Sequence, residues 1–424
     1  MSITRDRLKA IIGGSAGNLV EWYDWFAYAS FSIYFAPLFF PNGDLTAQLL
    51  NTAAIFAAGF VMRPIGAWVM GIYADRHGRK SGLAVSVGLM FAGSLLIAVA
   101  PTPAVAGVFA PAILLIARMI QGLSVGGEYG ASATYLSEMA PKERRGFWSS
   151  FQYATLCGGQ LLALGVLLLL QMILTEDQLS NWGWRIPFVI GAILALIVYI
   201  LRRKLAETQS FQNQAADRPK SSAANLWRDH PKEAVLVAMM SAGGGLTTYA
   251  FTSYMQKFLV NTAGFTKESA TMVVASALVW LFCIQPFWGM AADRFGRRPL
   301  LLLSGTGVML LAVPVFTALE TVTSPWAALG LILLPLTLHG AYTANNAMVK
   351  AELFPAHIRA LGVALPYAIG NTLFAGTVEY VALRFKAAGV ESTFYYYIVA
   401  VVGMAVIAYI LLPETKLTSL IDED

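Results

Sequence analysis

Long apolar segments alternate with short polar connections along almost the whole chain. Each apolar segment is roughly 20 residues long or longer, which is the length of helix that crosses a bilayer. The pattern therefore predicts an all-α membrane protein with twelve transmembrane helices. The predicted helices lie at residues 11–40, 46–73, 82–100, 105–139, 146–174, 184–201, 234–260, 269–290, 300–319, 325–351, 358–383 and 394–412.

A polar stretch separates the sixth apolar segment from the seventh. Residues 204–232 are rich in Arg, Lys, Gln, Ser and Pro, a composition that cannot be buried in lipid and is typical of a linker. We therefore expect a six-helix bundle at 1–203, a linker at 204–232 and a second six-helix bundle at 233–424.

Three polar motifs occur twice, in the same order, after corresponding apolar segments. In the first half they follow the second, fourth and sixth segments, and in the second half the eighth, tenth and twelfth. The pairs are Gly71-x-x-x-Asp75-Arg76-x-Gly78-Arg79-Lys80 with Gly289-x-x-x-Asp293-Arg294-x-Gly296-Arg297-Arg298, Glu138-x-x-Pro141-x-x-x-Arg145 with Glu352-x-x-Pro355-x-x-x-Arg359, and Leu205-x-Glu207-Thr208 with Leu412-x-Glu414-Thr415. Such internal repetition indicates two pseudo-symmetric six-helix halves.

Composition agrees with a membrane protein. Of 424 residues, 57% are hydrophobic and 12% are charged, and the mean hydropathy is +0.62, whereas soluble domains carry about 25% charged residues. The pI near 9.1 is not accompanied by the basic-aromatic interleaving of nucleic-acid binders. The long first apolar segment does not fit a cleavable signal peptide. Cys157 and Cys283 both lie inside apolar segments, so we expect neither a disulfide framework nor a metal cluster.

The distribution of Lys and Arg predicts the orientation. Most of these residues lie on the N-terminal tail, the odd-numbered connections or near helix ends, while two, Arg63 and Arg118, lie deep inside predicted helices. The positive-inside rule then places both termini and the linker in the cytoplasm. The few basic residues on or near the even-numbered connections are Arg185, Lys257, Lys267, Arg384 and Lys386.

The repeated motifs place acidic and basic side chains together at the ends of predicted helices. Arginine and carboxylate side chains can form bidentate pairs that hold two helix ends together and separate when the halves move apart. We therefore expect a gate on the cytoplasmic side. The alternative is that the charges only set topology on a solvated face, each pair contributing about 0 to 1 kcal/mol. The expected gate residues are Asp75, Arg76, Arg79, Glu138, Arg145, Glu207, Asp293, Arg294, Arg297, Glu352, Arg359 and Glu414.

Charged residues near the middle of the membrane are candidates for proton coupling. Arg118 lies near the middle of the fourth predicted helix, where a lone Arg costs about 2.5 to 3.5 kcal/mol, so it is expected to face a partner or a wet cavity. Asp24 lies near the middle of the first, and Glu21, about one turn before it, shares its face. We expect Asp24 and Arg118 to form the proton-coupling pair, with Glu21 and Glu128 as further candidates. A permanent buried ion pair is the structural alternative.

Arg63 is the second basic residue inside a predicted helix. A small dicarboxylate needs two cationic contacts to leave water, and a guanidinium group binds a carboxylate through two parallel hydrogen bonds. Arg63 and Arg118 are the expected substrate contacts, with Tyr249 and Tyr254 added from the second half. The alternative for Arg63 is a scaffold ion pair with Glu128, since buried charges are usually paired.

Other polar residues within the second-half helices can either line a cavity or join neighbouring helices. Lys257 is expected to extend to the membrane surface, and His339 is expected to be a hydrogen-bonded packing residue. The remaining members of this group are Thr252, Gln285, Asn345, Asn346, Asn371 and Glu379.

Over essentially its whole length the chain resembles the major facilitator superfamily, and within it the metabolite:proton symporter family. The resemblance implies the twelve-helix major facilitator fold and proton-coupled import of a small carboxylate, with alpha-ketoglutarate or a related dicarboxylate expected. In the similar sugar-porter branch, the residues matching Asp24 and Arg118 form the proton-coupling pair. The stretches that carry the resemblance are Gly17 to Asp24, Gly59 to Gly66, Gln121 to Gly130, Trp182 to Pro187, Tyr254 to Lys257 and Glu379 to Leu383.

A coupling mechanism follows as a hypothesis. Without substrate, Asp24 is held ionised by Arg118. An incoming carboxylate competes for Arg118, and the desolvated Asp24 then takes up a proton. The proton and the anion are thus expected to enter together by alternating access. We expect no cofactor, membrane lipid as surroundings, no nucleic-acid partner, a monomer, and a bacterial inner-membrane location.

Several alternatives stay open from the sequence. A symporter of the same family for citrate, shikimate, an aromatic acid or a compatible solute would share these motifs, although the short stretch 414–424 after the last helix lacks the long charged tail of an osmosensing member. The fifth predicted helix lacks the G-x-x-x-G-P phrase expected of a drug antiporter. A membrane sensor or enzyme is disfavoured because the chain has no HExxH, GxSxG or Walker motif, and no repeated pore ring suggests a channel.

Overall fold

The computed structural model describes residues 5–77, 79–126, 129–203, 222–355 and 358–421, and helices occupy all twelve predicted positions. In the first half these helices are α1 (Arg5–Phe39), α2 (Leu45–His77), α3 (Arg79–Ala98), α5 (Phe109–Gly126), α6 (Tyr129–Met139), α7 (Arg145–Ile173) and α9 (Ile186–Arg203). Short helical turns connect them: α4 (Pro103–Ala106), η1 (Lys142–Arg144), α8 (Glu176–Asn181) and η2 (Gly183–Arg185).

The second half begins with a short helix, α11 (Ala223–Asp229), inside the predicted linker. The elements that follow are α12 (Pro231–Phe251), α13 (Ser253–Asn261), α14 (Lys267–Phe295), α15 (Arg298–Thr321), α16 (Pro325–Thr343), α17 (Asn346–Glu352), α18 (Arg359–Gly370), the π-helical turn η3 (Asn371–Ala375), α19 (Val378–Ala387) and α20 (Ser392–Leu411). In the described part, ten helical segments are long and apolar enough to cross a membrane, and Ala84–Ala98 is a shorter apolar helix.

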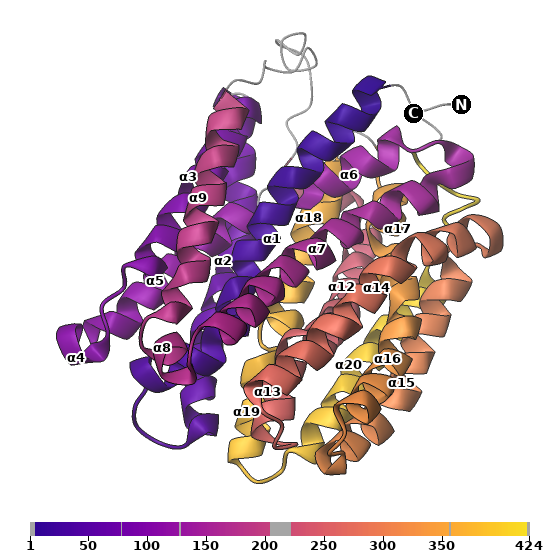
Figure 1. The fold of residues 1–424 in the computed structure, drawn as a ribbon. Helices are drawn as coiled ribbons and strands as arrows, with labels where there is room; N and C mark the ends of the chain where they lie inside the picture. Colours follow the sequence, from indigo (N-terminus) through magenta and orange to yellow (C-terminus); the bar gives the residue numbers. More distant parts are fainter. Residues whose placement is uncertain (1–4, 78, 127–128, 204–221, 356–357, 422–424) are drawn as a thin grey trace.

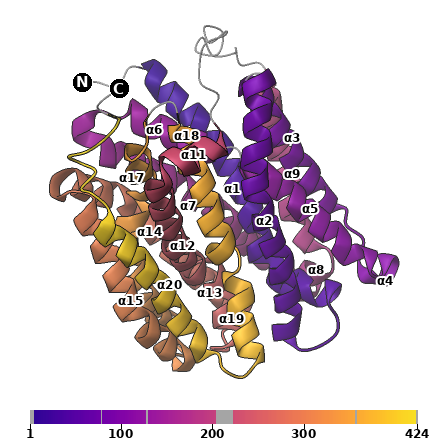
Figure 2. The same ribbon diagram turned by 180° about the vertical axis from the view of Figure 1, so that it is seen from behind.

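The helices form two bundles that lie side by side (Figures 1 and 2). The bundles meet where α7 packs along α14, where α2 packs on α18, η3 and α19, and where α6 packs on α17 and α18. We call the end where α1 begins, α20 ends and α11 lies the near end, and the opposite end, with α4 and α8, the far end (Figure 2). The described helices agree with two halves, but the boundaries at 1–203, 204–232 and 233–424 stay a prediction.

At the near end, two glycines allow the backbones of the two halves to come into contact. A Cβ atom added at Gly146 of α7 would clash with the backbone of Gly289 on α14, and one added at Gly289 would clash with Gly146 in return. Such contacts between backbones are typical of helix packing in membranes, where small side chains let dispersion contacts form. Gly289 is the first residue of the second copy of the repeated motif, so the motif begins at a packing contact between the halves.

Three predicted helices of the second half are interrupted, which the hydropathy pattern did not predict. The seventh breaks at Thr252 between α12 and α13, the tenth at residues 344–345 between α16 and α17, and the eleventh at η3 between α18 and α19. A break leaves backbone groups that need polar partners, so in membranes it is tolerated where protein or a cavity surrounds it. All three breaks are packed inside the protein: Thr252, Asn345 and Asn371 are buried.

Candidate functional site

Arg118, on α5, is fully buried and held mainly by aromatic rings. The rings are those of Trp25, Tyr28 and Phe56, with centroids 4.0, 4.7 and 5.1 Å from the guanidinium carbon. Nη1 donates a hydrogen bond to Gln121 Oε1 at 2.6 Å. In the described part of the chain, Nε and Nη2 have no hydrogen-bond partner. Arg118 therefore retains donors that a carboxylate could accept, since cation–π contacts leave the N–H edge of the fork unused.

Asp24, on α1, does not contact Arg118 directly. Its Oδ2 accepts hydrogen bonds from Ser94 Oγ on α3 and from Gln121 Nε2 on α5, while Gln121 Oε1 accepts from Arg118. Gln121 thus lies between the two members of the expected ion pair. Gly191 on α9 makes room for Asp24, because any Cβ there would meet Asp24 Oδ1.

Arg63, on α2, packs on the indole ring of Trp25, which Arg118 also contacts. Its guanidinium carbon lies 3.9 Å from the ring centroid of Trp25, 4.1 Å from that of Phe60 and 5.1 Å from that of Trp22. Arg63 is 3% exposed, and its Nε and Nη2 have no hydrogen-bond partner among the described residues. Two like charges buried around one ring repel each other, and an anion between them would relieve both the repulsion and the unmet hydrogen bonds.

Tyr249, on α12, brings the second half to this cluster. Its ring packs on Phe26, Phe56 and Phe60, with centroids 5.6, 6.1 and 5.4 Å apart, and the hydroxyl group lies within electrostatic range of Arg63. The structure therefore brings together four predicted site residues from both halves: Asp24, Arg63, Arg118 and Tyr249.

Other predicted site residues lie elsewhere or cannot be placed. Tyr254 packs on Phe258 and Phe394, away from the arginines, with centroids 6.1 and 5.3 Å apart. Glu21 is buried on α1, one turn before Asp24. Glu128 lies outside the described residues.

The second half contains a buried ion pair that the sequence did not reveal. Lys257 Nζ on α13 lies 2.6 Å from Glu379 Oε2 on α19, and the two side chains are 2% and 3% exposed. The expectation that Lys257 extends to the membrane surface is therefore wrong, as is the inference that only Arg63 and Arg118 are basic residues inside the helices. Hydropathy could not show that Lys257 and Glu379, 122 residues apart, face each other.

His339 agrees with its expected packing role. Its Nε2 lies 2.9 Å from Thr248 Oγ1, and its ring stacks on Tyr342 at 5.4 Å.

At the near end, several predicted gate residues form ion pairs. Arg359 on α18 donates to Glu138 on α6 at 2.6 Å, and Arg145 on α7 lies 3.4 Å from Glu352 on α17, so both pairs join the two halves. Arg297 also lies 3.4 Å from Glu352, within the second half.

Two of the expected gate carboxylates accept hydrogen bonds from backbone N–H groups, and Asp293 also lies 3.8 Å from Arg297 Nη2. Asp293, at the end of α14, accepts hydrogen bonds from Gly146 N and Phe147 N at 2.7 and 3.0 Å. It thereby caps α7 of the other half, because the first N–H groups of a helix lack partners and carry partial positive charge. Glu414 accepts from the backbone N–H groups of residues 297 and 298 at the start of α15. Among the described residues, no arginine side chain forms an ion pair with Glu414.

The remaining predicted gate residues form no described ion pair or lie outside the described side chains. Arg294 is exposed, lies over the ring of Phe295, and forms no ion pair among the described residues. Glu207 and the side chains of Asp75, Arg76 and Arg79 lie outside the part of the chain that the structure describes.

The far end is also closed by contacts between the halves. Asn261 on α13 donates to Thr46 on α2 at 3.1 Å, and Lys267 on α14 lies 2.6 Å from Glu176 on α8. Because both ends are joined and the arginines are buried, the structure represents an occluded state.

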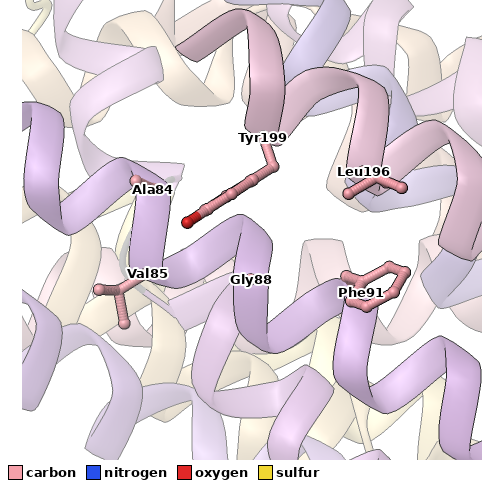
Figure 3. Close-up of a pocket in the computed structure, with 6 residues that line it drawn as sticks. All are labelled: Ala84, Val85, Gly88, Phe91, Leu196 and Tyr199. Carbon is pink, nitrogen blue, oxygen red and sulfur yellow. The ribbon is translucent and has the colours of Figure 1, made fainter. Parts of the chain in front are cut away.

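A pocket of about 320 Å³ lies elsewhere, between α3 and α9 (Figure 3). It contains none of the predicted site residues. Its lining is almost entirely apolar and consists of Ala84, Val85, Gly88, Phe91, Leu196 and Tyr199.

Comparisons with known sequences identify relatives of the chain. The family model described as Major Facilitator Superfamily matches residues 24–377. The chain is 49% identical to the alpha-ketoglutarate permease of Escherichia coli (strain K12) over 96% of this chain and 94% of that protein. It is 34% identical to the citrate-proton symporter of Klebsiella pneumoniae over 87% of this chain and 83% of that protein. Both relatives are transporters, in agreement with the prediction that the chain is not an enzyme.

A solved structure confirms the predicted fold. The proton:xylose symporter XylE bound to 6-bromo-6-deoxy-D-glucose superposes with a TM-score of 0.78 at 20% identity, covering 97% of each chain. The sequences have diverged too far for this likeness to extend beyond the fold.

The near-end ion pairs predict a change in the opening of the protein. We expect Glu138→Gln to shift the distance between spin labels at Arg144 and Asp229, measured by double electron–electron resonance, towards longer values, because the pair with Arg359 joins the halves. The Glu138 side chain is 42% exposed, so its contribution is about 1 kcal/mol or less, roughly a fivefold change in the open-to-closed ratio at most.

Glu143→Gln is the matched control, since Glu143 is exposed in the same connection. The two native cysteines, Cys157 and Cys283, are replaced by Ser in every labelled variant. An unchanged distance distribution in Glu138→Gln, or an equal shift in the control, would contradict a gating role.

The buried pair in the second half predicts non-additive effects on stability. We expect Lys257→Gln and Glu379→Gln each to lower the free energy of unfolding by about 3 to 5 kcal/mol, because each leaves one buried charge without its partner. The double variant should be more stable than either single variant. Thermal unfolding in detergent measures this.

The far-end pair of Lys267 and Glu176 is the control, because Glu176 is 63% exposed. Its single variants should change stability by about 1 kcal/mol or less. Additive losses for Lys257 and Glu379 would show that the two side chains stabilise the fold independently.

Proposed function

Because this chain belongs to the Major Facilitator Superfamily, we propose that it is a proton-coupled symporter that imports a small dicarboxylate, alpha-ketoglutarate or a close relative, by alternating access. The observation that carries the proposal is the pair of buried guanidinium groups that share Trp25. Each has N–H donors without partners in the described part of the chain. Two separate cationic forks match a molecule with two carboxylates better than one with a single carboxylate.

The relatives support the substrate class. The relative at 49% identity is named for alpha-ketoglutarate, and the one at 34% is named for citrate with a proton. Both substrates are small polycarboxylates, so two guanidinium groups suit either. The higher identity favours alpha-ketoglutarate.

Gln121 connects substrate binding to the proton. A carboxylate that binds Arg118 competes with Gln121 Oε1 for the guanidinium group, and a displaced Gln121 no longer donates to Asp24. The Asp24 carboxylate then loses one of its two donors while buried, and an ionised carboxylate in a dry site is stabilised by taking up a proton. Ser94 stays as a partner that can donate to the carboxylate or accept from the acid. The proton and the anion are therefore bound together.

Alternating access requires the two ends to open in turn. Opening the near end breaks the contacts of Glu138 with Arg359 and of Asp293 with the first N–H groups of α7. Opening the far end breaks the contacts of Lys267 with Glu176 and of Asn261 with Thr46. Each set is small and polar, so it can be remade after each cycle, as expected for rocking halves.

The orientation and location are part of the same proposal. The near end faces the cytoplasm, because the basic residues of the chain gather there in the sequence. The protein is a monomer in the bacterial inner membrane, with lipid around the bundle and no nucleic-acid partner.

The function is tested with purified protein in liposomes. We expect labelled alpha-ketoglutarate to accumulate when the outside is acidic, and to accumulate less when an ionophore collapses the pH gradient. A panel of citrate, shikimate, benzoate and betaine measures selectivity by competition. Uptake that does not change with the pH gradient would exclude proton symport. A protein that transports no carboxylate would exclude small carboxylates as the substrate class.

Asp24 is tested by separating proton coupling from substrate movement. Asp24→Asn should abolish accumulation driven by the pH gradient and retain exchange of labelled for unlabelled alpha-ketoglutarate, because the amide cannot take up the proton but leaves the arginines in place. Asp177→Asn, an exposed change on α8, should behave as the unmodified protein. Normal accumulation in Asp24→Asn would remove Asp24 from the proton pathway.

A further inference from the structure

Lys350 is a buried cation that the proposed mechanism does not use. It lies on α17, is 0% exposed, and donates a hydrogen bond to Asn346 Oδ1 at 3.0 Å. In the described part of the chain it forms no ion pair, whereas the other buried lysine, Lys257, is paired with Glu379. The positive charge of Lys350 is therefore not balanced by any described acidic side chain.

Two aromatic rings, stacked on each other, form one side of the buried enclosure around the ammonium group. Lys350 Nζ lies 4.2 Å from the ring centroid of Tyr367 and 5.5 Å from that of Tyr129. The two rings stack on each other at 3.7 Å, and the Tyr129 hydroxyl donates to Asn346 Oδ1 at 3.1 Å. Cation–π contacts stabilise an ammonium group by about 2 kcal/mol when it is desolvated, which is less than the several kcal/mol needed to bury an ion.

Both halves of the protein build this enclosure. Tyr129 belongs to α6 of the first half, while Lys350 and Tyr367 belong to α17 and α18 of the second, and α6 packs on both of these helices. When the near end opens, Tyr129 therefore moves away with the first half. The movement uncovers Lys350 and frees Asn346 from the Tyr129 hydroxyl.

The enclosure lies between the arginine cluster and the near-end gate. Tyr367 is within electrostatic range of Arg63 and Tyr249, which places one wall beside the cluster. Glu352, a member of the gate, follows Lys350 by two residues on the same helix. An anion that leaves the arginines for the near end passes this position.

We propose that Lys350 and Asn346 form a second carboxylate-binding site, which receives the dicarboxylate after it leaves Arg63 and Arg118 and before it is released at the near end. The inference rests on the proposed function. Lys350 supplies the positive charge, and Tyr129 closes the site when the near end is shut. One N–H of the Asn346 amide donates to Thr343 O at 2.8 Å, and the other supplies a neutral donor. A cation that no described carboxylate balances in the occluded state is thus ready for an anion when the halves separate.

The test measures alpha-ketoglutarate transport from each side separately, in right-side-out and inside-out membrane vesicles. Lys350→Gln should raise KM for substrate presented at the near end about tenfold, the change expected for losing about 1.4 kcal/mol of binding. KM at the far end should change less than twofold. Lys350→Arg should keep near-end KM within about threefold of the unmodified value, because the charge is retained.

Lys232→Gln is the control for a lost near-end charge, since Lys232 is exposed at the start of α12. It should leave both KM values unchanged. Asn346→Asp is a second variant that does not leave a buried charge unpaired. It places a carboxylate beside Lys350, so it should raise the unfolding temperature and still raise near-end KM.

The outcomes separate this inference from the proposed function. An unchanged near-end KM in both Lys350→Gln and Asn346→Asp, with normal far-end uptake, would overturn the second site and leave symport standing. An equal rise of KM at both ends would also overturn it, because Lys350 would then act on the fold and not on one side of the path. An unmodified protein that transports no carboxylate would overturn the proposed function itself.

Discussion

The rest of the structure depends on how two guanidinium groups are held inside a bundle that must remain apolar outside. The ring of Trp25 stabilises both groups by cation–π contact, because its centroid lies about 4 Å from the guanidinium carbons of Arg63 and Arg118. Aromatic faces lower the energy of a buried cation without occupying its N–H groups. The arginines are therefore stable enough to be buried and still have hydrogen bonds to offer. Charge balance by carboxylates alone would have used those donors within the protein.

At the closed near end, a single carboxylate makes several of the contacts between the halves. Asp293 caps a helix of the opposite half, so one carboxylate satisfies two backbone N–H groups that are otherwise without partners. Gly146 and Gly289 let the two backbones come close enough for this contact. The halves are joined by polar contacts at both ends and by apolar contacts between them, including the packing of Tyr249 on Phe26, Phe56 and Phe60.

Sequence reasoning placed the deep charges well but matched partners poorly. Arg63, Arg118 and Asp24 were identified because each is a charge inside a long apolar segment, and all three are buried together with Tyr249. Gln121 was missed as the link between Asp24 and Arg118, because an uncharged amide three residues after an arginine has no distinctive signal. Lys257 was misplaced because it lies near a predicted helix end, where hydropathy cannot distinguish a buried lysine from one that reaches the surface.

The sequence alone determined the twelve helices, the repetition of the halves and the set of charges that must avoid lipid. These properties are local, because bilayer thickness sets helix length and the free energy of burying a charge depends on the residue itself. Only the tertiary structure decided which charges meet. Lys257 pairs with Glu379, Asp293 caps the start of α7, and Lys350 lies beside two tyrosines. These contacts depend on how helices that are distant in the sequence pack, rotate and break. Hydropathy carries no information about rotation around a helix axis, so the choice of partner appears only when the bundle is assembled.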